Sequence, residues 1–313
     1  MHEINDVKPT SIRHIVGQVG VVKQVGVALD AAFADGRKFD SALLVGGPGL
    51  GKSALAAVIA EEMATNFHEI LGQSIKTPSD LNALLLSAKN KDVLHIDEGH
   101  LLKKEFQTAL YLAMDQRKFV VQSGCGQAPY SVPIEDFTLL LSTTDEYCLL
   151  QPLRDRMKMV LRFEFYDEKE LAVVAMQRAK GLQWDVEETV FPQLAQRARG
   201  TPRLALRLLQ ACHRVCRSQG KQTITQDHLR LACELEGIDD LGLGPTENKY
   251  LSILFQGPVR LNVIASLLGL PPRTVSQVTE QFLIRAELIC KDDQGRRQLT
   301  ALGRNRVHTA SNS

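Results

Sequence analysis

The sequence predicts an α/β fold, with a core of parallel sheet sandwiched by helices, then a small helical domain and a winged-helix domain. Three observations predict it. Up to residue 166, short apolar runs alternate with helical patterns, which is typical of a parallel α/β sheet. From Asp167 onward the strand-like runs stop, and the tail, Thr246–Ser313, ends in a hairpin pattern. We therefore expect domains at residues 1–166, 167–240 and 241–313.

Four segments of the first half are predicted to be fully buried parallel strands. Each is short, apolar and bounded by turn or charged residues, as such strands are. They are Ala42–Val45, Val93–Ile96, Thr138–Leu141 and Met159–Phe163. Helical patterns lie between them, for example over Ser53–Ala64 and Lys104–Asp115.

The middle of the chain reads as a small helical domain. Asp167 and Thr225 are good N-caps, and Glu170, three residues after Asp167, suits a capping box. The predicted helices are Asp167–Gly181, Glu187–Arg199, Pro202–Ser218 and Thr225–Glu236. A stretch rich in Gly and Asp, Gly237–Pro245, reads as a linker.

The tail has the pattern of a winged helix, with three helices before a hairpin. Pro271–Pro272 separates the second helix from the third. A turn centred on Gly295 joins the two hairpin strands. The helices are Asn248–Phe255, Leu261–Leu267 and Thr274–Ala286, the strands are Leu288–Lys291 and Arg297–Thr300, and Thr309–Ser313 is expected to fray. Nine basic and five acidic residues give this tail a charge of +4.

Composition excludes some classes of protein. Among the 313 residues, 44% are hydrophobic and the formal charge is +1, so DNA would have to be held by a local basic patch. The first ten residues lack the apolar region of an export signal, and no apolar run of about 18 residues could cross a membrane. The six cysteines show no paired framework. We therefore expect a cytoplasmic protein, not bound to membranes, with reduced thiols.

A phosphate-binding loop is the most informative motif. The residues Gly46, Gly47, Pro48, Gly49, Leu50, Gly51, Lys52 and Ser53 fit G-x-x-x-x-G-K-[ST] at every fixed position. The glycines let backbone N–H groups turn toward phosphate oxygens, and the following helix adds its N-terminal dipole. Lys52 should reach the β- and γ-phosphates and Ser53 should bind Mg²⁺. The motif therefore predicts ATP and Mg²⁺ as cofactors.

A pair of carboxylates follows the predicted strand at Val93. By itself, an Asp-Glu pair after a strand reads as a solvated strand end. Because Asp97 lies 45 residues after Lys52, behind a phosphate-binding loop, we expect it to organise Mg²⁺. Glu98 is expected to polarise the attacking water. His100 is expected to support the site structurally.

Hydroxyls and arginines complete the predicted site. Thr144, with Thr143 in reserve, ends a strand at the edge where ligands bind open parallel sheets, although these hydroxyls also suit the capping of a turn. Arg156 and Arg154 could supply a charge to a neighbouring subunit's site or lie solvated on the surface. Arg203 opposes the dipole of its helix, which favours a phosphate contact or an intersubunit salt bridge.

The chain resembles the RuvB family of Holliday junction branch-migration ATPases over nearly its whole length. Arg199–Arg203 and Gly257–Val259 are more specific to that family than the phosphate-binding loop is. The segments that carry the resemblance are Ile15–Gln18, Gly46–Ser53, His95–His100, Pro152–Arg156, Phe163–Tyr166, Arg199–Arg203 and Gly257–Val259.

The resemblance implies an AAA+ ATPase core, a helical lid and a winged-helix DNA-binding domain. It places Ile15 and Val16 near the adenine, makes Thr144 and Arg203 the two nucleotide sensors, and makes Arg156 the arginine finger, with Arg154 as the alternative. It further implies a homohexameric ring that moves duplex or four-way junction DNA in recombination and repair. Arg297, and next Arg296, would touch DNA phosphates without reading sequence.

Three departures from the family pattern stand out. Gly99 replaces the residue usual between the catalytic glutamate and the histidine, and Asp292-Asp293 lie beside the wing arginines. The segment Lys118–Val132 occupies the position of the hairpin that docks a RuvA-like junction-binding partner. Here the segment contains the run Val120–Gly126, which is less apolar at the tip than the family norm.

The leading hypothesis is therefore an ATP-driven DNA motor of the branch-migration type. One alternative is an ATP-dependent switch or clamp-loader-like protein that grips DNA without translocating. Another is a DNA-binding regulator that does not hydrolyse ATP. Intact Glu98 and Arg156 favour hydrolysis, and the winged-helix tail favours the motor over the loader.

Overall fold

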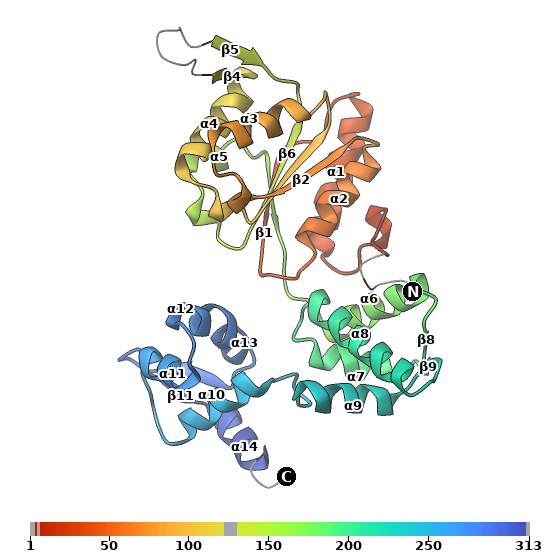
Figure 1. Ribbon diagram of the computed structural model, residues 1–313, viewed down its shortest axis with the longest axis vertical. Helices are drawn as coiled ribbons and strands as arrows, with labels where there is room; N and C mark the ends of the chain where they lie inside the picture. Colours follow the sequence, from red (N-terminus) through yellow and green to blue (C-terminus); the bar gives the residue numbers. More distant parts are fainter. Residues whose placement is uncertain (1–3, 5–6, 122–129, 311–313) are drawn as a thin grey trace. The chain divides into compact units, whose positions relative to one another are not determined.

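The computed structural model describes residues 4, 7–121 and 130–310 (Figure 1), with no account of the side chains of residues 120, 121, 309 and 310. It divides into two compact units. The first comprises Met1–Gln183 with Gly200–Arg203, and the second comprises Trp184–Arg199 with Leu204–Ser313.

The first unit is built on a five-stranded parallel sheet with the order β2-β3-β6-β1-β7. Its strands are β1 (Ala42–Val45), β2 (Phe67–Leu71), β3 (Val93–Asp97), β6 (Thr138–Thr143) and β7 (Met159–Arg162). The four predicted strands are confirmed, and β2 was not predicted. The expectation of full burial is wrong for β7, because it is an edge strand with exposed residues.

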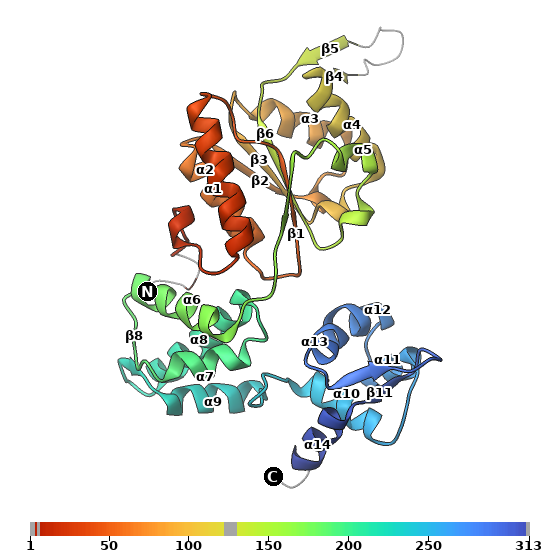
Figure 2. The same cartoon turned by 180° about the vertical axis from the view of Figure 1, so that it is seen from behind.

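Helices cover both faces of this sheet (Figures 1 and 2). One face carries α1 (Val19–Ala34) and α2 (Lys52–Glu62), and the other carries α3 (Pro78–Ser87), α4 (Lys104–Gln116) and α5 (Gln151–Arg154). Leucines of β1, β3 and β6 pack against α3 and α4 to form a buried apolar core. Short 3₁₀ turns lie at the connections: η1 (Ile12–His14), η2 (Gly72–Ser74), η3 (Gly99–Leu101) and η4 (Glu146–Cys148).

A two-stranded antiparallel hairpin continues from α4, with β4 (Lys118–Val121) paired to β5 (Tyr130–Pro133). It extends away from the sheet (Figures 1 and 2). This is the segment expected to dock a partner. Its tip, residues 122–129, lies outside the described residues.

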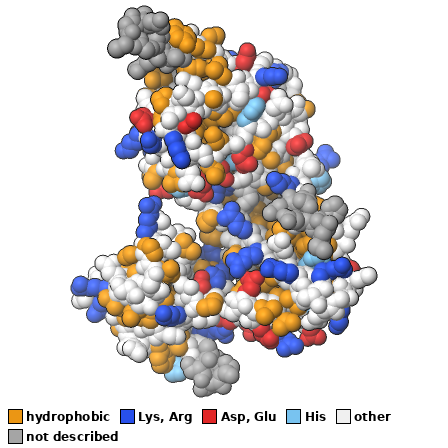
Figure 3. Space-filling model, viewed as in Figure 1, with side chains coloured by type: hydrophobic (Ala, Val, Ile, Leu, Met, Phe, Trp, Pro, Cys, Tyr) orange, Lys and Arg blue, Asp and Glu red, His pale blue; other side chains and the backbone are white. Residues whose placement is uncertain are grey.

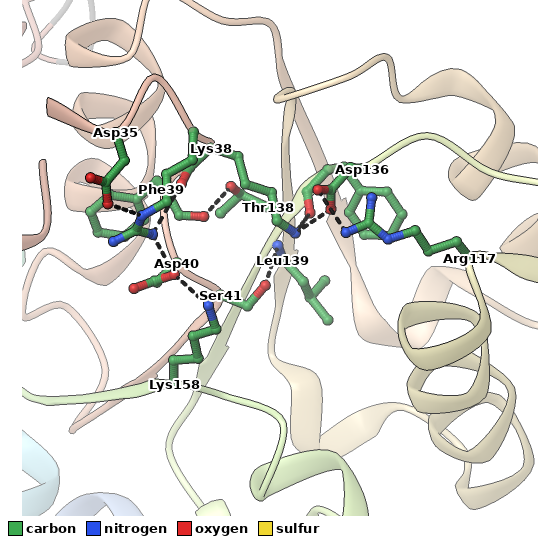
Figure 4. Close-up of polar contacts among 12 residues, drawn as sticks. Asp35, Lys38, Phe39, Asp40, Ser41, Arg117, Asp136, Thr138, Leu139 and Lys158 are labelled. Carbon is green, nitrogen blue, oxygen red and sulfur yellow. Dashed lines mark hydrogen bonds and ion pairs between the residues drawn. The ribbon is translucent and has the colours of Figure 1, made fainter. Parts of the chain in front are cut away.

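Polar contacts fasten the amino-terminal edge of the sheet (Figure 4). The Thr138 hydroxyl donates to the Phe39 carbonyl at 2.6 Å, and the Leu139 N–H donates to the Ser41 hydroxyl at 3.1 Å. Two carboxylates each hold a pair of cations at this edge. Asp40 pairs with Arg37 and Lys158, and Asp136 pairs with Lys38 and Arg117.

Asp92, just before β3, is a buried carboxylate satisfied by several donors. It accepts from the side-chain amide of Asn66 at 3.0 Å, from His68 at 3.0 Å and from the Lys89 N–H at 2.9 Å. Burial alone would raise the pKa of Asp92, but these donors outweigh it and lower the pKa. The Asp92 carboxylate therefore links the start of β2 to the start of β3 through its hydrogen bonds.

The helices predicted for the middle of the chain are confirmed as α6 (Glu168–Gly181), α7 (Val190–Arg197), α8 (Pro202–Ser218) and α9 (Gln226–Glu236). The capping box of Asp167 and Glu170 is present, with the Glu170 N–H donating to Asp167 at 2.7 Å. The start predicted for α7 is wrong, because Asp185–Val186 (β8) pairs with Thr223–Ile224 (β9) and the helix begins after that bridge. The predicted linker is packed, since Leu243 is fully buried.

The tail confirms the winged-helix prediction and adds a final helix. Its elements are α10 (Pro245–Phe255), α11 (Leu261–Leu268), α12 (Pro272–Thr274), the π-helical turn η5 (Val275–Thr279), α13 (Glu280–Arg285), β10 (Ile289–Lys291), β11 (Arg297–Leu299) and α14 (Ala301–Ala310). The third helix was predicted as one piece, and here a π turn joins α12 to α13. Tyr250, Leu254 and Leu283 lie in the buried core of this domain.

The surface charge is mixed (Figure 3), and three of the cysteines are buried as free thiols. In the face shown in Figure 3, positive and negative side chains are interspersed over the described residues. Cys212, Cys216 and Cys233 are free and buried, and burial raises the pKa of Cys212 to about 12. Within the described ranges, no helix is both long and apolar enough to cross a membrane.

Candidate nucleotide-binding site

The phosphate-binding loop connects the buried strand β1 to α2. Gly49 and Gly51 have φ of +78° and +97°, a backbone conformation that favours glycine. A side chain at Gly49 would also collide with Arg203, since an added Cβ would lie 2.8 Å from the Arg203 Cβ. The Tyr166 hydroxyl donates to the Leu50 carbonyl at 3.3 Å. Because burial raises the pKa of Tyr166 to about 12, this donor keeps its proton at neutral pH.

Lys52 lies buried within the loop. Its Nζ donates to the carbonyls of Gly46 and Gly47 at 2.9 and 2.8 Å. Burial lowers the pKa of Lys52, and the charges of Asp97 and Glu98 partly oppose that shift. A cation is thus held in the centre of the loop, where phosphate oxygens would replace the two carbonyls as its partners.

Ser53 and Asp97 meet across the site. The Ser53 hydroxyl donates to Asp97 Oδ2 at 2.9 Å, and the other carboxylate oxygen accepts the Glu98 N–H at 2.9 Å. Hydroxyl and carboxylate oxygens are the ligands that Mg²⁺ takes from proteins. The residues predicted for the metal therefore lie together, at the carboxyl end of β3.

Glu98 directly follows Asp97 and contacts His100. Its backbone is left-handed, with φ of +52°. Glu98 Oε2 lies 3.4 Å from His100 Nε2, and His100 Nδ1 lies 3.3 Å from the Thr143 hydroxyl. Thr143, the reserve sensor, is buried at the end of β6, while Thr144, the preferred sensor, is exposed just beyond it.

A second histidine crosses the sheet just below the site. His95, fully buried in β3, contacts Glu69 of β2 at 3.0 Å and the Ser142 hydroxyl of β6 at 2.8 Å. A Ser–His–Glu series resembles a hydrolytic triad, but Ser142 has no exposed surface for a substrate to reach, and only Glu69 is exposed among the three residues. It joins three strands instead. Sequence reasoning missed it, although a histidine within the apolar run of β3 was the available signal.

Gln107 of α4 braces the loops that leave β3 and β6. It is almost fully buried. Its side-chain amide donates to the Leu102 carbonyl at 2.8 Å and accepts the Leu150 N–H at 2.7 Å. Sequence reasoning did not single out this residue.

Arg156, the expected arginine finger, lies against α4. Its Nε is 2.8 Å from each carboxylate oxygen of Asp115, its Nη1 donates to the Pro152 carbonyl at 2.6 Å, and it stacks over Tyr111. Arg154 bonds Gln151 and lies over the Tyr147 ring. Neither arginine contacts the phosphate-binding loop through these bonds.

Arg203 is brought to the loop, whereas Ile15 and Val16 are placed beside α2. The Arg203 N–H donates to the Gly49 carbonyl at 3.3 Å. Ile15 and Val16 directly follow η1, which Glu62 of α2 holds by accepting from the Ser11 hydroxyl at 2.7 Å and the Ile12 N–H at 2.8 Å. Both hydrophobic residues are partly exposed.

The wing arginines are both committed within the winged helix. Arg297 makes a two-pronged ion pair with Glu280 at 2.7 and 3.1 Å, and Glu280 also accepts from the Tyr250 hydroxyl at 2.8 Å. The Arg297 side chain is 11% exposed and that of Glu280 only 1%. Arg296 is 40% exposed and pairs with Asp292 at 2.7 Å. The preferred DNA contact is thus the less accessible of the two.

Family models match almost the entire chain. One for the Holliday junction DNA helicase RuvB P-loop domain matches residues 7–163, one for the RuvB AAA lid domain matches 166–239, and one for the RuvB C-terminal winged helix domain matches 240–307. This chain belongs to the RuvB family. It is a RuvB-like branch-migration motor with a P-loop ATPase domain, and that domain implies nucleotide binding.

Individual members of the RuvB family agree. The Holliday junction branch migration complex subunit RuvB of Thermotoga maritima is 35% identical over 92% of this chain and 88% of its own. The RuvB 2 subunit of a Synechococcus species is 34% identical over 92% of this chain and 80% of its own. The solved structure of the T. maritima RuvB Holliday junction branch migration motor has a TM-score of 0.83, with 33% identity over 96% of this chain and 98% of its own.

Proposed function

We propose that this chain hydrolyses ATP with Mg²⁺ at the loop of Gly46–Ser53 and uses the energy to move Holliday junctions in DNA recombination and repair. The observation that carries the proposal is the meeting of Ser53 and Asp97 at 2.9 Å, directly behind the buried Lys52. Phosphate, metal and water sites are thereby adjacent. We keep 1–166, 167–240 and 241–313 as the ATPase, lid and winged-helix domains.

Each residue of the site has a proposed role. The N–H groups from Gly46 to Gly51 hold phosphate oxygens, and Lys52 offsets their charge. Mg²⁺ supplies charge neutralisation there, held through Ser53 and Asp97. Glu98 orients water for attack, and Thr144 senses the nucleotide from the end of β6. Ile15 and Val16 cover the adenine.

Two arginines extend the site beyond these residues. Arg203 approaches the nucleotide from its position on the Gly49 carbonyl. Arg156 serves a neighbouring copy, because its bonds place it with Asp115 of α4 and not with its own loop. A finger that acts in trans requires an assembly, and a homohexameric ring is the proposed one.

DNA and a partner complete the proposal. Duplex or four-way junction DNA is held by its phosphates, with Arg297 and Arg296 as the proposed wing contacts. Arg296 is the more exposed of the two. A RuvA-like junction-binding protein is proposed to dock on the hairpin of β4 and β5. Chromosomal DNA lies in the bacterial cytoplasm, where we place the protein.

ATP turnover combined with junction migration tests the proposal. We expect turnover that duplex DNA stimulates, and disruption of a synthetic four-way junction when a RuvA-type protein is added. Stimulated turnover without migration would support a switch. Absence of turnover, with Glu98→Gln behaving like the starting protein, would support a non-hydrolysing regulator.

A nucleotide-binding assay tests the role of the phosphate-binding loop separately from the roles of the residues proposed for hydrolysis. Lys52→Ala should abolish binding of a fluorescent ATP analogue, because it removes the cation at the centre of the loop. Lys103→Ala is the matched control, since Lys103 has an exposed side chain and pairs only loosely with Glu105 at 3.8 Å. Equal analogue affinity for the two variants would contradict the proposed role of the loop.

A further inference from the structure

We propose that His100 is a positioning residue that fixes the Glu98 carboxylate relative to the end of β6, through the hydroxyl of Thr143. The inference rests on the proposed function, in which Glu98 orients the attacking water. It adds a residue to that site, with a role that can be measured separately from the role of Glu98.

The imidazole ring of His100 is placed to join two elements. Its two nitrogens lie on opposite sides of the ring. One is 3.4 Å from Glu98 Oε2 and the other is 3.3 Å from the Thr143 hydroxyl. The His100 side chain is 15% exposed and that of Glu98 38%. The ring is therefore mostly buried, whereas the carboxylate is partly exposed to solvent.

Glu98 needs such a contact, because its backbone does not fix its carboxylate. The backbone is held in the left-handed region by the bond from the Glu98 N–H to Asp97. Three side-chain torsions remain free beyond that point. Because catalysis depends on the direction of the carboxylate, a contact at its tip affects turnover more than nucleotide binding.

The hydroxyl of Thr143 carries a single proton, and this makes its contact with His100 sensitive to the turn after β6. The Thr143 hydroxyl donates to the Asp145 carbonyl at 3.0 Å and accepts the Asp145 N–H at 3.0 Å. A neutral imidazole carries one N–H. When that N–H is on Nε2, facing Glu98, Nδ1 can hydrogen-bond Thr143 only by accepting the hydroxyl proton, which removes that proton from the Asp145 carbonyl.

A change in the backbone around Asp145 therefore changes whether the Nε2 atom of His100, which faces Glu98, carries the imidazole proton. Asp145 directly follows Thr144, the proposed nucleotide sensor, so the two lie in one turn. The series of contacts from Asp145 through Thr143 and His100 to Glu98 joins that turn to the carboxylate proposed to orient water. No other element is needed to connect them.

Three substitutions at His100 separate positioning from packing. Glutamine reaches about as far as Nε2 and can still donate to Glu98. Asparagine reaches only about as far as Nδ1, so it keeps the Thr143 contact and loses the one to Glu98. Alanine loses both. Steady-state turnover, ATP affinity and the thermal midpoint are measured for the full chain with duplex DNA.

We expect His100→Ala and His100→Asn to lower kcat by about tenfold or more while KM for ATP stays within about twofold. His100→Gln should lower kcat less than either, because it keeps the contact to Glu98 but loses the one to Thr143. Thr143→Val should lower kcat and Thr143→Ser should restore it, because only serine keeps the hydroxyl. His308→Ala, an exposed histidine of α14, is the control.

Several outcomes would overturn the inference. These are unchanged kcat in His100→Ala, equal losses in the glutamine and alanine variants, or a fall in kcat matched by weaker ATP binding. Combining His100→Ala with Glu98→Gln must also add no further loss in single-turnover hydrolysis. If Glu98→Gln alone keeps full turnover, the proposed function fails and the inference falls with it. Loss in Glu98→Gln with full activity in His100→Ala overturns the inference alone.

Discussion

At the scale of single residues, charged side chains are held by partners far away in the sequence. Arg156 bonds Asp115, 41 positions earlier, and Arg297 bonds Glu280, 17 positions earlier. Neither pairing has a local pattern that sequence reasoning could use. Both decide what the arginine is free to do, because a paired guanidinium must exchange its partner before it meets a phosphate.

The proposed finger predicts a complementation result. Arg156→Ala should bind ATP but fail to hydrolyse it, since transition-state charge is no longer stabilised by the neighbour. Mixing it with Glu98→Gln, also inactive, should restore part of the turnover. In the mixture, an intact Glu98 of one copy meets an intact Arg156 of the next. Turnover that stays at zero at every mixing ratio, with assembly verified, would rule out action in trans.

The buried pair in the winged helix predicts a stability change. Glu280→Gln should lower the free energy of unfolding of this domain by about 3–5 kcal/mol, because Arg297 is left buried without its counter-charge. Arg296→Ala, on the exposed neighbour, should cost about 0–1 kcal/mol. Denaturant unfolding followed by far-UV circular dichroism measures the stability of both variants. Equal midpoints for the two variants would contradict a structural role for Arg297.

DNA binding by the same arginines needs a salt series. If Arg296 meets a phosphate, Arg296→Ala should weaken binding to all sequences alike and reduce the salt slope by about one counter-ion. Affinity of this variant for duplex DNA at several salt concentrations checks this. The same series on Arg297→Ala, read beside its stability, tests the original preference for Arg297.

At the scale of elements, glycines within helices give a matched pair. A Cβ added at Gly26 of α1 would meet nothing within 4 Å, whereas at Gly181 of α6 it would lie 2.5 Å from Val7. Gly26→Ala should therefore stabilise the protein by about 0.5–1 kcal/mol through helix propensity. Gly181→Ala should destabilise it by crowding. Thermal midpoints of the two variants, moving in opposite directions, are the expected result.

Strong local patterns explain which elements the sequence predicted. The four predicted strands are short, mostly apolar runs, and α6 and α9 follow good N-caps, Asp167 and Thr225. The strand β2 escaped prediction because Phe67–Leu71 contains His68 and Glu69, and only its partner β3 makes it a strand. The helix α14 carries few apolar residues, and its Gly303 is required by the Leu288 carbonyl, which an added Cβ would meet at 2.0 Å.

The candidate site divides in the same way. The loop of Gly46–Ser53 and the pair Asp97-Glu98 were recognisable because their chemistry needs fixed spacings. His95 and Gln107 were not, since they act through strands and loops that only the fold brings together. His100 was expected to support the site, but its contact with Thr143 could not be predicted. Supporting contacts of this kind join residues with no fixed spacing in the sequence, so no motif identifies them.

At the scale of the whole molecule, buried and paired carboxylates predict acid sensitivity. In the folded protein the pKa of Asp40, Asp92 and Asp136 lies below the ordinary 3.8, because bonds from their cations and donors outweigh burial. A lowered carboxyl pKa stabilises the fold fully above the unfolded value. That stabilisation is lost as the pH falls through the folded values.

The free energy of unfolding should therefore decline below about pH 5 and continue to decline below pH 3.8. Asp92→Asn should be less stable at pH 7 and should show a shallower decline in acid. Denaturant midpoints measured from pH 7 to pH 3 check this. A variant whose acid decline is as steep as that of the starting protein would remove Asp92 from the explanation.

The helix α4 connects the hairpin of β4 and β5 to the loops of the nucleotide-binding site. Its 13 residues form a rod of about 20 Å. Gln107, near the start of α4, hydrogen-bonds the loops that follow β3 and β6. Asp115, near the end of α4 and just before the hairpin, pairs with Arg156. A force applied to the hairpin would therefore be transmitted along α4 to the loops after β3 and β6 and to Arg156, the proposed finger. A partner bound to the hairpin would then be expected to change the rate of ATP hydrolysis.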